Sequence, residues 1–271
     1  MDNSNKLTVV KSNAIIDAGY YLSIYENRIL LTCISQINSM GEIGLNDVFT
    51  VSAQDLIGLI GLDDKNTYKQ LKKAVDRLYE RSVTIDLPNN EILKVRWVSS
   101  IKYIKQAGTV ELKFSQDMIP YILQIRREFT QYRLKNVLMF KSNYSIRVYE
   151  LLVKWSGDHK TVTVEWLKKQ FQLETKYTRI GDLKKYVLDI AIKEINQYSD
   201  MNVQYSQIKQ GRNVIAFKFK YGLKHPQPKK SKHNFNDHIH GISRAEIEKN
   251  ARVGESYSEA AARLAKLKNT H

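Results

Sequence analysis

The sequence predicts an α+β protein made of two tandem winged-helix domains and a flexible basic C-terminal tail. Three observations support this fold class: a helix-turn-helix pattern followed by a β-hairpin at residues 163–221, a similar order of elements about 111 residues earlier, and a net charge of +15 over 271 residues. We expect the N-terminal winged helix at residues 1–135, the C-terminal winged helix at residues 136–223, and the tail at residues 224–271.

The C-terminal winged helix has the most regular pattern. Its first helix is expected to begin at Thr163, a residue type that caps helix N-termini, and to end at Leu173, with apolar residues at helical spacing between them. The following segments are a turn at residues 174–178, a helix at residues 181–198, and strands at residues 203–209 and 214–221 around a turn at residues 210–213. A helix-turn-helix with a basic wing suits the major groove of DNA and its flanking phosphates.

The second helix of this domain is predicted to have one face packed on the domain and one face free. The packed face is expected to contain Leu183, Tyr186, Val187, Ile190 and Ala191. The free face is expected to contain Lys185, Asp189, Lys193 and Asn196. The alternative for the lysines is an ordinary solvated helix face.

An internal repeat favours the DNA-binding interpretation. Residues 51–62 (VSAQDLIGLIGL) match residues 162–173 (VTVEWLKKQFQL) at an offset of 111, and Leu71 matches Leu183 at an offset of 112. One extra turn residue therefore separates the two copies, and each copy ends in a hairpin. The same elements in the same order indicate two winged helices in tandem.

The second helix of the first copy, expected over residues 66–81, is amphipathic. Its predicted buried face consists of Leu71, Ala74, Val75 and Leu78. The residues predicted to contact DNA lie on the opposite face and are Asn66, Lys69, Gln70, Lys73 and Arg77. Because Asp76 and Glu80 flank them, a solvated charged face is the alternative.

The rest of the first domain is predicted from local signals. Residues 1–22 are expected to be an extended lead that packs on the first domain or on a partner. Two capping boxes, Ser23 with Glu26 and Ser52 with Asp55, predict helix starts because each pair of side chains can bond the other residue's backbone amide. Strands are expected at residues 48–51, 83–87, 92–105 and 110–114, and a helix at residues 117–127.

The positive charge is spread over the folded part of the chain. Net charges are +4 for residues 1–141, +7 for residues 142–224 and +4 for the remainder, so the second winged helix is the most basic unit and a polyanionic partner is expected. The single cysteine, Cys33, lies on an apolar helix face, which excludes a disulfide framework and a thiolate metal site. No apolar run approaches the ~20 residues of a membrane span and the first residues are polar, so we expect a cytoplasmic protein.

Two segments carry a family resemblance. They are residues 129–134 (FTQYRL), which lie within the boundary region expected between residues 128 and 141, and residues 142–152 (SNYSIRVYELL), which directly follow it. Over about residues 11–223 the chain resembles the iteron-binding plasmid replication initiators, which have F-T-x-[YF]-R-L and S-x-Y-[SA]-x-R-[LV]-Y-E-L-L segments. The resemblance implies monomers that bind direct repeats (iterons) at an origin, dimers that repress the protein's own promoter through an inverted repeat, and recruitment of host replication initiator and helicase proteins.

The second domain supplies the main candidates for DNA contact. They are Thr178, Arg179, Lys184, Lys185 and Lys193 on or before its second helix, with Lys209 and Arg212 holding phosphates from the wing. We therefore expect a sequence-specific binder of double-stranded DNA that uses no cofactor and no metal. A plain transcriptional repressor with the same fold is the nearest alternative.

The tail raises one enzymatic alternative. His238 and His240 form a His-hydrophobic-His pattern with Tyr257 nearby, as in the rolling-circle nickases that hold a divalent metal beside a tyrosine nucleophile. That chemistry needs both histidines on one sheet strand, and residues 229–237 are too polar and irregular to build it. The sequence also lacks a G-x-x-x-x-G-K-[ST] phosphate loop, so we expect no catalysis. The tail is expected to be mobile, with helix-forming segments at residues 243–252 and 258–268.

Overall fold

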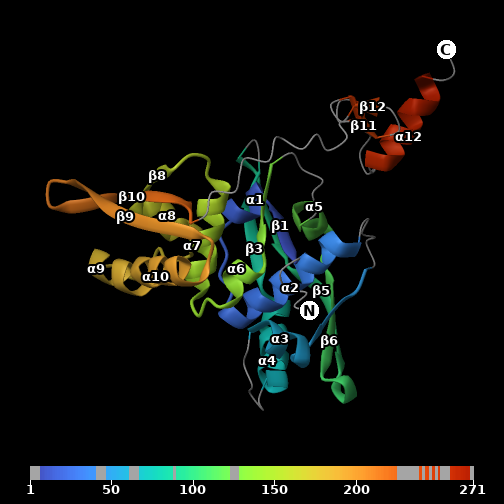
Figure 1. Cartoon of the computed structure of the whole chain (residues 1–271), viewed down its shortest axis with the longest axis horizontal. Coiled ribbons are helices and arrows are strands. Elements are labelled where there is room, and N and C mark those ends of the chain that lie inside the picture. Colours follow the sequence, from blue (N-terminus) through green and yellow to red (C-terminus); the bar gives the residue numbers. More distant parts are fainter. Residues whose placement is uncertain are drawn as a thin grey trace. The chain divides into compact units, whose positions relative to one another are not determined.

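The computed structural model describes residues 7–40, 47–60, 67–87, 90–122, 128–224, 238–239, 242–243, 246–247, 250 and 257–268. The chain divides into two compact units, residues 1–225 and 226–271. The first unit contains both winged helices, with the first in blue to green and the second in yellow to orange (Figure 1).

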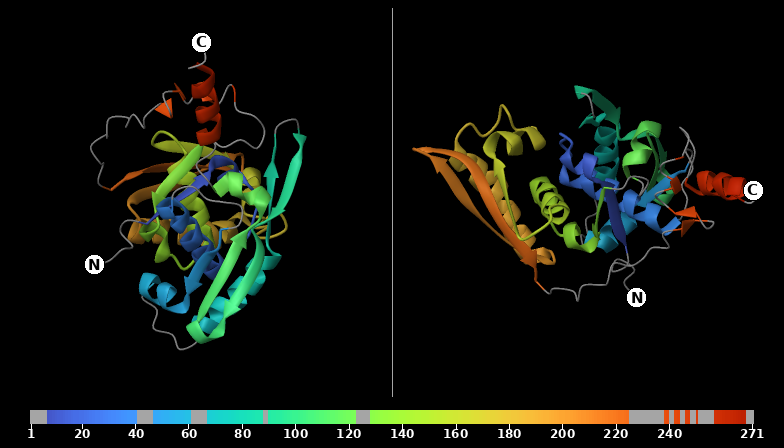
Figure 2. Two further views of the ribbon diagram at one scale, coloured as in Figure 1. Left: turned by 90° about the vertical axis from the view of Figure 1, so that its right-hand side faces the viewer. Right: turned by 90° about the horizontal axis from the view of Figure 1, so that it is seen from above.

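The first winged helix has the order strand, helix, helix and two wing strands. The strand β2 (Phe49–Ser52) leads into α3 (Ala53–Ile60) and α4 (Thr67–Glu80), and the wing consists of β5 (Val98–Ile104) and β6 (Thr109–Phe114). These strands form an antiparallel sheet in the order β2-β6-β5. Figure 2 shows β5 and β6 in green as a two-stranded ribbon.

An extra hairpin of β3 (Ser82–Asp86) and β4 (Ile92–Arg96) is inserted between α4 and this wing. The single strand predicted at residues 92–105 is therefore wrong. Trp97, whose side chain is fully buried, lies between β4 and β5. Its backbone N–H donates to the carbonyl of Arg81 and its carbonyl accepts from the N–H of Ser115, so the chain passes at this residue from the β3–β4 hairpin to the sheet of the wing.

The second winged helix repeats the order of the first. The strand β8 (His159–Thr163) leads into α8 (Val164–Gln170), and the wing consists of β9 (Met201–Gln210) and β10 (Asn213–Leu223), shown in orange in Figure 2. The sheet order β8-β10-β9 corresponds to β2-β6-β5 in the first copy. The predicted pair of tandem winged helices is thus confirmed.

The long helix between α8 and the wing is not a regular α-helix throughout. Its segments are α9 (Ile180–Leu183), a π-helix η5 (Lys184–Leu188) and α10 (Asp189–Tyr198). Tyr186 and Ile190, predicted on the packed face, are instead 44% and 37% exposed, whereas Leu188 is buried. Leu183, Val187 and Ala191 are buried as predicted, so the regular helical period was wrong only for Tyr186 and Ile190, within and next to the wider π turn.

The predicted N-terminal caps are confirmed. The side-chain oxygen of Thr163 accepts from the backbone N–H of Trp166 at 3.1 Å, and α8 begins at the next residue. Ser23 and Glu26 bond each other's backbone amides at the start of α2 (Ile24–Met40). The second capping box does the same at the start of α3, with distances of 3.1 and 2.9 Å.

The N-terminal lead packs on its own chain. Its strand β1 (Thr8–Ser12) pairs antiparallel with β7 (Phe129–Arg133), and α1 (Asn13–Asp17) follows directly. The helix predicted at residues 117–127 is a short 3-10 turn η4 (Gln116–Met118) and α5 (Ile119–Ile122), with residues 123–127 outside the description. The remaining elements of this unit are a 3-10 turn η3 (Lys105–Ala107), α6 (Lys135–Leu138) and α7 (Asn143–Lys154).

The second unit is small. It contains a hairpin of β11 (His238–Ile239) and β12 (Ile242–Ser243) and the helix α12 (Tyr257–Lys268), which agrees with the helix predicted at residues 258–268. Its buried apolar cluster consists of Ile242, Ile247, Ala260 and Ala261. The helix predicted at residues 243–252 lies largely outside the description. In the part of the chain that is described, no helix is long and apolar enough to cross a membrane.

Candidate nucleic-acid interface

In the second winged helix, the second helix and the wing are joined into one surface. The Asn196 side chain of α10 donates to the carbonyl of Val203 in β9 at 2.9 Å and accepts from its N–H at 2.7 Å. Asn196, predicted on the free face, is therefore half-buried against the wing. Further along, the Tyr205 hydroxyl donates to Asp189 Oδ1 at 2.5 Å, so β9 runs antiparallel along the helix toward its N-terminal end.

The same link occurs in the first winged helix. The Tyr103 hydroxyl of β5 donates to Asp76 Oδ1 of α4. Partial burial and the hydrogen bond to the carboxylate raise the pKa of Tyr103 and of Tyr205, so both phenols remain donors at neutral pH. In both copies, a tyrosine of the wing thus fixes the strand to the helix.

The predicted contact residues of the second domain lie at the surface. Thr178, Arg179, Lys185, Lys193, Lys209 and Arg212 are exposed, and Lys184 is half-buried. Among the described residues, no carboxylate forms an ion pair with any of these lysines and arginines, although the Lys185 ammonium lies 4.9 Å from the ring centroid of Tyr186. Their positive charges are therefore available to an external anion.

A buried carboxylate anchors this helix from behind. Glu194 of α10 accepts from the backbone N–H groups of Lys141 and Ser142 at 3.1 and 3.2 Å, and from the Ser145 hydroxyl at 2.6 Å. These donors form the start of α7, where a negative charge is favoured by the unpaired amides and the helix dipole. The orientation of α10 is thus fixed relative to α7.

The predicted contact residues of the first domain are in mixed environments. Lys69 and Lys73 are exposed on α4, and Gln70 is half-buried. Arg77 is not free, because its Nε lies 2.9 Å from Oε1 of Glu26, a fully buried carboxylate that also binds Arg81 at 3.2 Å. Asn66 lies outside the described residues. Of the described residues predicted to contact DNA from α4, Lys69 and Lys73 are thus exposed without an ion pair, whereas Arg77 is held by Glu26.

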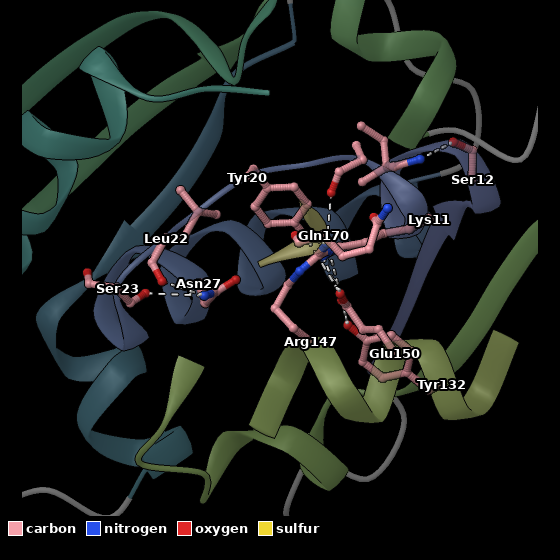
Figure 3. Close-up of polar contacts among 12 residues, drawn as sticks. Lys11, Ser12, Tyr20, Leu22, Ser23, Asn27, Tyr132, Arg147, Glu150 and Gln170 are labelled. Carbon is pink, nitrogen blue, oxygen red and sulfur yellow. Dashed lines mark hydrogen bonds and ion pairs between the residues drawn. The ribbon is translucent and has the colours of Figure 1, made fainter. Parts of the chain in front are cut away.

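The 142–152 segment forms a buried polar junction that sequence analysis did not assign (Figure 3). Glu150 of α7 accepts from the Lys11 ammonium at 2.7 Å and from the hydroxyls of Tyr132 and Tyr20 at 2.6 and 3.4 Å. Lys11 and Glu150 are fully buried. Burial disfavours the charge of Lys11 and is the largest single influence on its pKa. The attraction of Glu150 and of Tyr20, together with the hydrogen bond to Glu150, outweighs it and raises the pKa of Lys11 above its ordinary value.

Arg147, one turn earlier in α7, extends this junction to the second winged helix. Its guanidinium lies 3.9 Å from the ring centroid of Tyr20 and donates to the carbonyls of Ala18 and Gln170 at 2.8 and 3.3 Å. The arginine and the glutamate of the S-x-Y-S-x-R-V-Y-E-L-L segment, Arg147 and Glu150, thus hold the N-terminal segment, α7 and α8 together. The only sequence signal for this role was the occurrence of charged residues inside an apolar helix.

The described residues contain no cluster of histidine, cysteine or carboxylate side chains that could hold a metal ion. His238 lies in the short strand β11, and His240 lies outside the description.

Comparisons with known proteins agree with this architecture. A family model described as "Initiator Replication protein, WH1" matches residues 8–153, and one described as "Initiator Rep protein, WH2" matches residues 163–221. A "Replication initiation protein" of Escherichia coli is 29% identical over 228 residues, covering 81% of this chain and 71% of the relative. The "PI protein" of Escherichia coli is 24% identical over 82% of this chain and 84% of its own length.

One solved structure shares the fold over most of both chains. It is the Pi initiator protein in complex with iteron DNA, which superimposes with a TM-score of 0.71 at 23% identity and covers 82% of this chain and 99% of the other.

Proposed function

Because the chain belongs to the replication initiator family with two winged-helix domains, we propose that it starts plasmid replication by binding repeated sites in double-stranded DNA. The solved relative was crystallised with iteron DNA, and we extend this class of site to the present chain. The proposal is that the protein acts by binding and positioning, without a cofactor and without catalysis of its own.

One observation carries the proposal, namely the cationic surface of the second winged helix. Lys185 and Lys193 on the helix and Lys209 and Arg212 in the wing are exposed, and the wing is fixed to the helix. A duplex offers a major groove for the helix and two rows of phosphates beside it for the wing and the helix start. Phosphate contacts release counterions and supply affinity, while side chains in the groove supply specificity.

The first winged helix is proposed as a second, weaker contact. Its α4 presents Lys69 and Lys73, and its wing is fixed to α4 in the same way as in the second copy. Arg77 is proposed to act mainly through Glu26, by holding α4 on α2. Two helices that enter successive major grooves would be separated by one helical turn, roughly 34 Å.

Several finer features are proposed on the strength of the family resemblance. Monomers would bind direct repeats at the origin, dimers would bind an inverted repeat in the promoter of the protein's own gene, and the DNA-bound form would recruit host initiator and helicase proteins. We further propose domains at residues 1–135 and 136–223 and a tail at residues 224–271, with a location in the cytoplasm on plasmid DNA. Helix α7 follows the first of these boundaries and contacts both sides of it.

The proposal is tested by selecting duplexes from a random library with the full chain and measuring affinities for the enriched site at several salt concentrations. Arg212→Ala should weaken binding to this site and to random DNA alike and reduce the log-log salt slope by about 0.9, the value for one phosphate contact. The matched control is Lys94→Ala, which removes an exposed lysine from the inserted β3–β4 hairpin. Failure to enrich any site would contradict the proposed function.

A repressor with the same fold would pass these binding tests. The two functions are separated by a plasmid that carries only the enriched repeats and a selectable marker, with the protein supplied from a second plasmid. Replication of the repeat-bearing plasmid is expected. Promoter repression without replication would favour the repressor.

A further inference from the structure

The second helix of the second winged helix contains one more residue in its middle than the corresponding helix of the first winged helix. Leu71 corresponds to Leu183 at an offset of 112, but the next buried residues, Ala74, Val75 and Leu78, correspond to Val187, Leu188 and Ala191 at an offset of 113. The linked aspartates Asp76 and Asp189 also differ by 113. The π turn at residues 184–188 accommodates this extra residue, and such turns occur often at functional sites.

The π turn changes which residues face outward. At an offset of 113, Tyr186 and Ile190 occupy the positions of Lys73 and Arg77 in the first copy, on the outer face of the helix. They are among the large apolar residues that remain exposed, at 44% and 37%. The first copy thus has two cationic side chains at these positions, of which Arg77 is paired with Glu26, and the second copy has an aromatic and an aliphatic one.

These two side chains have exposed lysines near them, and the exposed Asp189 beside Ile190 accepts from the Tyr205 hydroxyl. Lys185 and Lys193 are exposed on the same helix, one residue before Tyr186 and three residues after Ile190. The Tyr186 ring stacks on Tyr177, with centroids 6.0 Å apart and an angle of 23° between the planes, which limits its freedom before any ligand binds. An apolar pair between cations fits the floor of a major groove, where thymine methyl groups lie between two rows of phosphates.

We propose that Tyr186 and Ile190 determine sequence specificity by packing against thymine methyl groups in the major groove. This inference rests on the proposed function, and it assigns base discrimination to two apolar residues rather than to the lysines beside them. Removing one buried methyl contact should reduce affinity about fourfold, from the transfer free energy of one methylene-sized group. The loss of such a methyl contact should leave the affinity for random DNA unchanged, since phosphate contacts supply that affinity.

The test replaces each thymine of the library-selected duplex in turn by deoxyuridine, which removes the major-groove methyl and keeps the base pair. The wild-type protein should lose about fourfold in affinity at one or more positions. Ile190→Ala or Tyr186→Ala should lose a similar factor on the thymine duplex and should no longer respond to deoxyuridine at the affected position. The matched control is Ile215→Ala, which removes an apolar side chain of similar exposure, 42%, from the wing and should respond as the wild type does.

The outcomes distinguish this inference from the function on which it rests. If the library yields no enriched site, the proposed function fails and the inference fails with it. If a site is enriched but every deoxyuridine duplex binds the wild type normally, the function stands and the methyl contact is excluded. If both variants keep the full wild-type response to deoxyuridine, the methyl is recognised elsewhere, and the assignment to Tyr186 and Ile190 is wrong.

Discussion

Replacing Lys11 by methionine should destabilise the protein far more than the same replacement at Lys169, although both lysines form ion pairs. The Lys11 ammonium lies 2.7 Å from Glu150, and both side chains are fully buried. The Lys169 ammonium lies 3.4 Å from Asp86, with side-chain exposures of 64% and 67%. The two variants therefore remove the same charge from a buried and from an exposed pair.

The expected magnitudes follow from burial. Removing one partner of a buried pair costs about 3–5 kcal/mol, whereas exposed pairs contribute about 0–1 kcal/mol. Without Lys11, Glu150 loses its closest cation and keeps the more distant Arg147, whose Nη1 lies 3.8 Å from its Oε2. For a chain of this size, 1 kcal/mol shifts Tm by about 2–4 °C. The Tm of Lys11→Met should thus fall by roughly 6–20 °C, and that of Lys169→Met by no more than about 4 °C.

The pH of the measurement follows from the sign of the pKa shift. The pKa of Lys11 is raised above its ordinary value of 10.5 in the folded protein. The corresponding stabilisation is therefore fully present below pH 10.5 and is lost as the pH rises through the folded-state pKa. Thermal and urea unfolding of the variants at pH 7 measures the whole effect.

A second substitution separates an unpaired charge from lost packing. In the Lys11→Met background, Glu150→Gln removes the carboxylate charge that has lost its closest cation, while the amide oxygen can still accept from Tyr132. The double variant should recover part of the lost stability, with a coupling of about 0.5–3 kcal/mol. A Tm of Lys11→Met within about 4 °C of the wild-type value would refute this reasoning. So would a loss of unfolding free energy on Glu150→Gln that is as large in the Lys11→Met background as in the wild type.

Three further outcomes are expected. Tyr205→Phe keeps the packed ring but removes the hydrogen bond to Asp189, so affinity for the selected site in a gel shift should fall about two- to tenfold while Tm changes little. An unchanged affinity would mean that DNA binding does not need this link between wing and helix. Glu194→Gln weakens the charged hydrogen bonds to the start of α7 and should cost about 1.5–3 kcal/mol in urea unfolding; a cost below 0.5 kcal/mol, on the order of the experimental error, would contradict this role. A chain that ends at Lys224 should bind the selected site like the full chain. It keeps the hydrogen bonds of the Lys224 ammonium to the carbonyls of Asn196 and Ser199. Loss of binding by a truncated chain that still folds would place the tail in the interface.

The sequence was sufficient for elements that local rules determine. The capping boxes and the Thr163 cap involve partners three residues apart, so their residue types alone locate the helix starts. The wing turn at residues 210–213 has Gly211 at a φ of 58°, a conformation that glycine adopts without strain. The repeat could be recognised because each copy keeps the same order of short elements.

Features that depend on distant partners or on a change of helical period were missed. Glu150 is separated from Lys11 by 139 residues, so no local pattern indicates that a buried ammonium is its partner. Arg77 looked like a surface cation because Glu26 lies 51 residues away. Tyr186 and Ile190 were assigned to the packed face because a regular helical period takes no account of the π turn at residues 184–188, although Val187 and Ala191 are buried as predicted.

The two winged helices are proposed to contact one side of a duplex in successive major grooves, and hydroxyl-radical footprinting on the selected site tests this contact most directly. We expect protection over about two helical turns, centred roughly 34 Å apart on one side of the DNA. Lys73→Ala should remove protection at one end of the site and Lys185→Ala at the other. Protection limited to a single groove, with Lys73→Ala changing self-association but no DNA contact, would contradict the claim and leave the first winged helix as a dimerisation domain.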